Sequence, residues 1–474
     1  MKAKFLLIVI ILLTGCAGFH REALSPSLTA SEFECRTLES TELRKYLEQN
    51  LHKEIVQWPP KSWGFNLLVL AALYYHPDMD VARARWGVAK AGIVTAGGRP
   101  NPGISLLGQH HSDTTGGISA WTWGASFDIP FETAGKRGYR IRRAEHLSDA
   151  ARLDVSTAAW RVWGRLRKSL LALYSSSRRE QFLEDALAIR RSTADIFERR
   201  LAVGESSRFE LTNSRVDLDR TRLLLSETQK QKAEARASLA GAIGLQVNAL
   251  AGTDISFDIF EKPPEAVSLG EVRRQALVNR SDISAALSGY EAAQSALQLE
   301  IARQYPDVHI GPGYEWDQGD NKWSLGLAVE LPILNRNEGP IQEARARRKD
   351  AAAKFRALQA AVIGKIDKAQ AAYLEALKKL EIADTMAATG KDRLQMALNR
   401  FDSGAASRLD LEQARLEFSL TSLARFDAFV SAQEGLGMLE DAVQRPLNKQ
   451  ELLLKEGISY LESGDKMKGG GAER

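Results

Sequence analysis

WTWGASFDIPF (residues 121–131) and WSLGLAVELPI (residues 323–333) are two copies of one pattern. In each copy the odd-numbered positions are mostly bulky and apolar, whereas the even-numbered positions hold small or polar residues, one acid and one proline. Side chains that alternate with a period of two are typical of a β-strand. Because the copies align at an offset of 202 residues, the sequence indicates an internal duplication.

A further strand is expected before each copy. Residues 307–316 carry mostly bulky side chains at even positions, and a polar loop is expected after them over 317–322. In the first repeat the matching strand is expected at 103–110, followed by a loop at 111–117 and a strand over 118–130. The sequence therefore predicts two β-hairpins in each chain.

The four expected strands have the length and pattern of strands that cross a membrane. Each has about 10 residues, which is enough to cross a bilayer when the strand is tilted. One face is apolar and the other is polar or small, the inverse of a soluble barrel with an apolar core. Tryptophans near the loop ends fit the aromatic girdle at a membrane interface, namely Trp121, Trp123, Trp316 and Trp323.

Four strands are too few to close a barrel in lipid, because an open sheet edge leaves backbone groups without hydrogen bonds. Two chains would supply eight strands and a lumen filled by side chains. The small inner residues Ser324, Gly326 and Ala328 fill space poorly. We therefore expect three chains to share one barrel of twelve strands.

Long helices are expected after both strand copies. They run over about 133–199 and 335–401, so each has about 67 residues and a length of roughly 100 Å. In the second of them, apolar residues recur at spacings of three and four, which is typical of a coiled-coil seam. Return helices are expected at about 208–245 and 408–443, and their two apolar stripes favour neighbours on both sides.

The turns between these helices match each other, with the sequences AVGESS and DSGAAS. Gly204 and Gly404 supply the permissive backbone with which a helix ends. Ser207 and Ser407 are suited to cap the return helices, and an acid three residues later completes a capping box. Each repeat is therefore expected to contain a long helical hairpin.

The first residues have the pattern of a secretory signal. Lys2 and Lys4 precede the apolar run 5–13, which is too short for a bilayer-spanning helix, and small residues then lead to Cys16. This pattern resembles a bacterial lipoprotein signal, in which Cys16 would carry the lipid, and the following alanine favours the outer membrane over the inner one. The alternative is an ordinary signal peptide with an incidental cysteine. Cys35 would then be the one cysteine left for other roles, so no intramolecular disulfide is expected.

Composition sets broad limits on the class of protein. The formal net charge of +4, from 64 basic and 60 acidic residues, gives no support for nucleic-acid binding. A length of 474 residues allows two or three domains. The expected organisation is a signal peptide (1–15), a lipidated N-terminal segment (16–65), a first repeat (66–251), a linker (252–267), a second repeat (268–444) and a C-terminal tail with a disordered end (445–474).

No catalytic motif stands out. The sequence contains no HExxH, paired CxxC or GxSxG, so we expect neither an enzyme nor a cofactor. His110, His111 and Asp113 could bind a metal ion, but they fall in an expected loop and adjacent histidines of a strand point to opposite faces. No metal site is therefore expected.

Taken together, these motifs resemble the TolC-type outer-membrane factors, the exit ducts of tripartite efflux pumps and of type I secretion systems. The resemblance covers the whole mature chain and rests on the lipoprotein-like cysteine, the paired strands, the duplicated turns, the segment HPDMDVARA at 76–84 and its weaker echo NRSDISAAL at 279–287. It implies a homotrimer with a twelve-stranded β-barrel in the outer membrane and a twelve-helix α-barrel in the periplasm. It also implies a mixed equatorial belt, for which 445–461 and 252–268 are candidates.

The resemblance also implies roles for the turns. Gly204, Ser207, Gly404 and Ser407 match the tips at which family members meet a periplasmic membrane-fusion adaptor. Asp410 occupies the position of a constricting acid that faces the pore, but a second acid of some relatives is replaced by Gln413. A simple capping role for Asp410 remains open beside the constriction.

The leading interpretation is a passive outer-membrane exit duct that works with an adaptor and an inner-membrane pump, often of the resistance-nodulation-division type. The alternatives are a type I secretion exit duct, a periplasmic coiled-coil scaffold lipoprotein that forms no channel, and a lipoprotein enzyme. The sequence leaves the choice of pump, and of drug, metal ion or protein as cargo, open.

Overall fold

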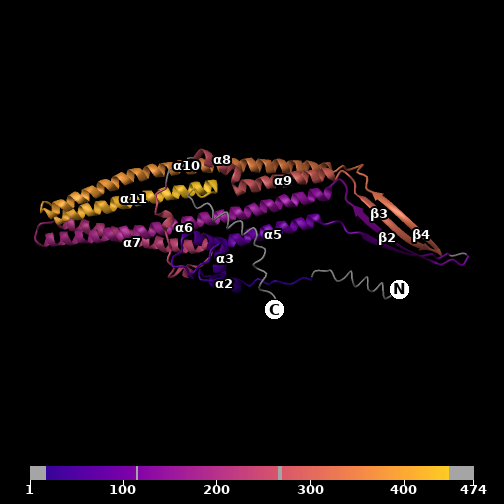
Figure 1. Cartoon of the computed structure of the whole chain (residues 1–474), viewed down its shortest axis with the longest axis horizontal. Coiled ribbons are helices and arrows are strands. Elements are labelled where there is room, and N and C mark those ends of the chain that lie inside the picture. Colours follow the sequence, from indigo (N-terminus) through magenta and orange to yellow (C-terminus); the bar gives the residue numbers. More distant parts are fainter. Residues whose placement is uncertain (1–17, 114–115, 265–268, 448–474) are drawn as a thin grey trace.

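The computed structural model describes residues 18–113, 116–264 and 269–447. The chain is elongated, with a β-sheet at one end and the turns of two helical hairpins at the other (Figure 1). Two helices determine this shape: α6 (Lys136–Ala202) has 67 residues and α10 (Glu338–Asp402) has 65. At 1.5 Å per residue each is roughly 100 Å long. The mainly helical fold with a strand portion is as predicted.

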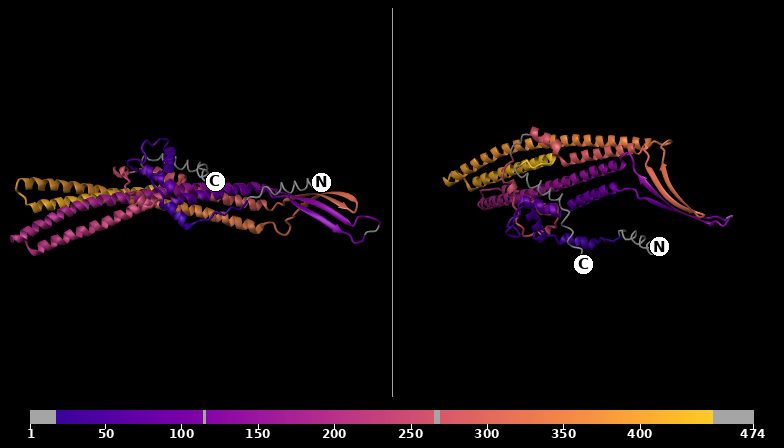
Figure 2. Two further views of the ribbon diagram at one scale, coloured as in Figure 1. Left: turned by 90° about the horizontal axis from the view of Figure 1, so that it is seen from below. Right: turned by 45° about the vertical axis from the view of Figure 1, so that its right-hand side comes forward.

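The other long helices pack along these two. On the side of the sheet, α5 (Pro77–Gly97) packs on α6, while α9 (Ser281–Ala302) packs on both α6 and α10. Toward the turns, α7 (Arg208–Ile243) packs on α6, and α11 (Arg408–Val443) packs on α10 and also on α6. The two repeats thus form one continuous layer of helices, seen edge-on and from below in Figure 2.

The sheet joins strands of both repeats in the order β1-β2-β3-β4, with every neighbouring pair antiparallel. Within the described residues, one edge of β1 and one edge of β4 have no partner strand. The four strands are β1 (Gly103–His110), β2 (Trp121–Phe131), β3 (Val308–Asp317) and β4 (Asp320–Val329).

Several strand boundaries differ from the prediction. The strand β2 begins at Trp121 and not at residue 118, and larger differences lie in the β3–β4 hairpin. The expected loop 317–322 is a tight turn, since Asp317 pairs with Asp320 and both Gln318 (φ 52°) and Gly319 (φ 109°) have the positive φ of a two-residue hairpin. The strand expected to reach residue 333 ends at Val329. The following Leu-Pro sequence has no N–H at Pro332 for a ladder hydrogen bond.

The faces of the sheet differ in chemistry. The outer face, defined by the even positions of β1 and β3 and the odd positions of β2 and β4, exposes large apolar side chains to an unusual degree. Leu106 is 78% exposed, Trp323 81% and Leu325 76%. The opposite, inner face carries small and polar residues, including Thr122, Asp128, His309, Glu315, Asp317, Lys322 and Ser324, with Leu107 as an apolar exception.

A hydrophobic core surrounds the middle of α6. The short helix α4 (Phe65–Tyr75) is apolar on all sides and is buried there, between α3 (Thr41–Leu51) and the indoles of Trp160 and Trp163. The remaining short elements are α2 (Pro26–Glu34), η1 (Val247–Leu250), η2 (Asp258–Phe260) and α8 (Leu269–Asn279). No helix in the part of the chain that the structure describes has the length and apolar character to cross a membrane.

A buried ion pair connects the two repeats. Arg167 Nε of α6 lies 3.1 Å from Glu440 Oε2 of α11, and both side chains are almost fully buried. Arg167 also donates hydrogen bonds to the carbonyl oxygen and to Oε1 of Gln433, at 3.0 and 3.2 Å. Gln433 Nε2 in turn donates to the carbonyl oxygen of Lys262 in the segment between the repeats, at 3.0 Å. One buried network therefore holds α6, α11 and the connecting segment in register.

Burial shifts the pKa values of both members of this ion pair. It raises the pKa of Glu440 and lowers the pKa of Arg167, because removal from water disfavours both charged forms. The Arg167 guanidinium also lies 5.7 Å from the centroid of the Phe260 ring, and Gly437 leaves no space for a side chain beside it. No motif in the sequence marks this network.

Candidate functional site

The outer face gathers aromatic side chains near the loop end of the sheet. Trp121 and Trp123 stack with ring centroids 5.4 Å apart, and Trp123 is the register partner of Trp316 on β3. Trp323 packs against Tyr314 with centroids 4.8 Å apart. The four tryptophans singled out from the sequence thus lie near the loop end of the sheet, at three successive positions of the outer face, and they are exposed or half-buried. Their role at a membrane interface remains a prediction.

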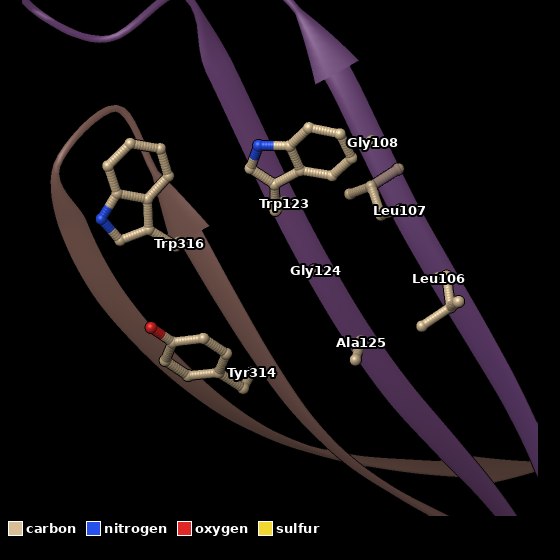
Figure 3. Close-up of a pocket in the computed structure, with 8 residues that line it drawn as sticks. All are labelled: Leu106, Leu107, Gly108, Trp123, Gly124, Ala125, Tyr314 and Trp316. Atoms are coloured by element: carbon tan, nitrogen blue, oxygen red, sulfur yellow. The ribbon is translucent and has the colours of Figure 1, made fainter. Parts of the chain in front are cut away.

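A shallow apolar depression of about 370 Å³ lies among these rings. Figure 3 shows the Trp123 ring extending over Gly108 of the neighbouring strand, where a Cβ would be only 3.0 Å from the ring. The lining residues are Leu106, Leu107, Gly108, Trp123, Gly124, Ala125, Tyr314 and Trp316. An apolar surface of this kind fits contact with lipid chains.

The inner face carries a polar network near the loop end. Thr122 Oγ1 donates a hydrogen bond to Asp317 Oδ1 at 2.6 Å, and its oxygen also lies 3.0 Å from His111 Nε2. Lys322 Nζ donates to Asp317 Oδ2 at 2.5 Å. Toward the helices, His309 Nδ1 lies 2.9 Å from Asp128 Oδ1. The inner face is therefore hydrophilic at both ends of the sheet.

The two predicted turns lie together at the far end of the molecule (Figure 1). Gly204 and Gly404 have φ of 76° and 75°, the left-handed backbone with which helices commonly end. Ser207 and Ser407 cap α7 and α11, and each forms a complete capping box with the acid three residues later. The turns are exposed, as a docking surface requires, and docking itself remains a prediction.

Asp410 is the capping acid of α11. Its Oδ2 accepts hydrogen bonds from the Ser407 hydroxyl and from the Ser407 backbone N–H, both at 2.8 Å. These two bonds, the hydroxyl first, lower the pKa of Asp410, so it remains ionised at neutral pH. The capping geometry is compatible with a second role, because the carboxylate is exposed at the tip of the hairpin.

Glu412 lies near the tip of the second helical hairpin, and Cys35 lies elsewhere. Glu412, passed over in the sequence, is buried at 2% exposure and bonds Arg408 Nη2 at 2.7 Å. The signal for it was an arginine four residues before and another three residues after it. Cys16, the predicted lipid anchor, and most of the segment 445–461 lie outside the described residues. Cys35 is exposed.

The sequence is similar to those of known proteins. Residues 68–245 and 272–434, more than half of the chain, match a family model described as outer membrane efflux protein. The cobalt-zinc-cadmium resistance protein CzcC of Cupriavidus metallidurans is 26% identical over 269 residues, which are 56% of this chain and 62% of the relative. The nickel-cobalt-cadmium resistance protein NccC of Alcaligenes xylosoxydans xylosoxydans is 22% identical over 293 residues, covering 59% and 63%. The chain thus spans less than two thirds of the length of these relatives.

Solved structures share the fold. The outer membrane protein VceC from Vibrio cholerae superposes with a TM-score of 0.64 at 21% identity, covering 80% of this chain and 95% of that one. The CmeC outer membrane channel of Campylobacter jejuni gives 0.65 at 17% identity, covering 91% and 94%. At these identities the likeness establishes the fold, including the union of long helical hairpins with a strand portion.

Proposed function

The chain belongs to the outer membrane efflux protein family, and we propose that it is the exit duct of a tripartite efflux pump. The observation that carries this proposal is the four-stranded sheet, with its apolar outer face, its hydrophilic inner face and its two unpaired edges among the described residues. Such a sheet satisfies its backbone in lipid only by pairing with further strands. Three copies would supply twelve strands and leave a water-filled lumen.

The same proposal covers the helices and the partners. Helices α5, α6, α9 and α10 of three chains beside the sheet, and helices α6, α7, α10 and α11 toward the turns, would continue the lumen as a twelve-helix tunnel through the periplasm. A membrane-fusion adaptor would dock on the tips at Gly204, Ser207, Gly404 and Ser407, and an inner-membrane pump, of the resistance-nodulation-division type, would supply the energy. The duct itself needs no catalytic group, and its fold neighbours are channels.

Divalent metal ions are the cargo that we propose. This rests on the two curated relatives, which are named for resistance to cobalt, zinc, cadmium and nickel. The test is a deletion strain that is challenged with these metals and with a panel of antibiotics, together with bilayer recordings on the purified protein. The deletion strain is expected to be sensitive to these metals and to regain resistance when the gene is returned, and the purified protein is expected to give stable ion currents. A strain without any sensitivity would contradict efflux, and sensitivity to antibiotics alone would contradict the metal cargo.

Asp410 gives a prediction on selectivity. In a trimer three Asp410 carboxylates would surround the tip of the tunnel and attract cations. Asp410→Asn is therefore expected to reduce the preference for cations over anions, measured as the reversal potential in a salt gradient across a planar bilayer. Glu210→Gln, the equivalent carboxylate-to-amide change at the cap of α7, is the matched control. Unchanged selectivity in Asp410→Asn would leave Asp410 as a capping acid.

A further inference from the structure

His309 lies on the inner face of the sheet, at the end where the strands join the helices. Its strand β3 begins at Val308, shortly after the end of α9, and its partner strand β2 leads directly into α6. The imidazole is 40% exposed, and Asp128, its partner on β2, is 57% exposed. In the proposed trimeric duct this is the passage from the helical tunnel into the strand barrel.

We propose that His309, oriented by Asp128, binds divalent transition-metal cations as they pass through the duct. This inference rests on the proposed function and adds to it a residue that meets the cargo. The site is a station for cargo in transit and holds no resident ion.

The hydrogen bond between the two side chains prepares the ring for a metal. A carboxylate can only accept, so Nδ1 of His309 donates its proton to Asp128 Oδ1, 2.9 Å away. In the neutral ring Nε2 then carries the lone pair. A carboxylate that receives the other N–H of an imidazole fixes its tautomer, orients the ring and raises its basicity, as at most metal-ligating histidines.

The neighbours of His309 leave space and supply negative charge. Its register partners are Pro130 and Ala328, and Gly311 follows on the same face, so none of these three neighbouring positions carries a large side chain. Glu330 lies two residues beyond Ala328 and Asp128 two before Pro130. These are the two acids that the duplication repeats.

The charged groups Asp307 and Lys136, next to the start of the strand, are paired with each other. Asp307, just before the strand, accepts hydrogen bonds from Lys136 Nζ and from the Thr133 backbone N–H, each at 2.8 Å. The Lys136 charge is thereby balanced by Asp307. Asp128 bonds the His309 ring, and Glu330 lies two residues beyond the register partner Ala328. These two carboxylates favour a cation over an anion.

A site with few metal ligands is suited to transport, because it binds the ion weakly. Among the described residues no three histidine, cysteine or carboxylate side chains come together as a metal site. A single imidazole with a supporting carboxylate binds weakly, and conduction requires that an ion leave a site as readily as it enters. Imidazole nitrogen favours zinc, cobalt and nickel over magnesium and calcium, which prefer oxygen ligands.

The test is the effect of Zn²⁺ on ion currents through the purified protein in a planar bilayer with potassium chloride. Zn²⁺ is expected to reduce the current of the unmodified protein, and Mg²⁺ at the same concentration is not. Asp128→Asn is expected to need about 10- to 100-fold more Zn²⁺ for the same reduction, and His309→Asn, which removes the ligand itself, is expected to need at least as much. His111→Asn is the control, because its Nε2 faces Thr122 at the opposite end of the sheet.

Equal sensitivity of His309→Asn and the unmodified protein to Zn²⁺ would overturn the inference, as would currents that Zn²⁺ does not affect. In the latter case the currents themselves would still support the duct. Equilibrium dialysis of Zn²⁺ against the same proteins in detergent separates the two ideas further. An absence of currents would contradict the proposed duct. Equal Zn²⁺ binding by His309→Asn and the unmodified protein would contradict the proposed metal site at His309.

Discussion

Replacing Gly404 with tryptophan is expected to abolish efflux while the chains still fold and assemble. Gly404 lies at the exposed tip of the hairpin of α10 and α11, and nothing lies within 4 Å of the position of a Cβ. An indole there would therefore disturb no internal packing. It would instead occupy the surface on which the adaptor is proposed to dock. Loss of metal resistance in a complemented deletion strain measures the effect.

The matched control for this change is Gly404→Ala. Both substitutions place a side chain on a backbone with φ of 75°, which costs about 1–3 kcal/mol in either case. Only tryptophan adds bulk to the docking surface. The alanine variant is expected to retain resistance, and both variants are expected to keep the oligomer of the unmodified protein. Full resistance with Gly404→Trp would rule out docking at this turn.

Arg167→Met is expected to destabilise the protein strongly. It would leave the Glu440 carboxylate buried without its counter-charge and would remove both hydrogen bonds to Gln433. Breaking a buried ion pair by removing one partner typically costs about 3–5 kcal/mol. The midpoint of thermal unfolding in detergent, followed by the helical circular dichroism signal, is the measurement.

The double variant Arg167→Met/Glu440→Met distinguishes an unpaired charge from a loss of packing. Replacing both members of a buried pair by apolar residues is often close to neutral. We therefore expect the double variant to unfold closer to the unmodified protein than either single variant does. Additive losses in the double variant would mean that the pair acts through packing and not through charge.

The duplication made much of the fold predictable. Two aligned copies of a strand and two aligned turns marked the ends of the long helices, and α11 begins at Arg408 and ends at Val443 as expected. The larger errors lie in the β3–β4 hairpin. The polar sequence there favours a six-residue loop, whereas strand pairing continues through polar residues until Gln318 and Gly319 make the turn.

The sequence does not predict contacts between segments that are far apart in the chain. Arg167 and Gln433 are 266 residues apart, and along their helices charged residues look like part of a solvated face. The sequence does not indicate a role for His309, for a related reason. Its role depends on the register that places it diagonally from Asp128, and no strand pattern specifies the pairing of β2 with β3. The roles of the tips, of Asp410 and of Cys16 remain predictions.

The number of chains in the membrane-extracted particle tests the central claim most directly. A sheet with four strands and two unpaired edges in the described chain must complete a ring with other copies. Native mass spectrometry of the detergent-solubilised protein is therefore predicted to give three chains per particle. A particle of two chains, or a single chain that remains in solution without detergent, would contradict the account.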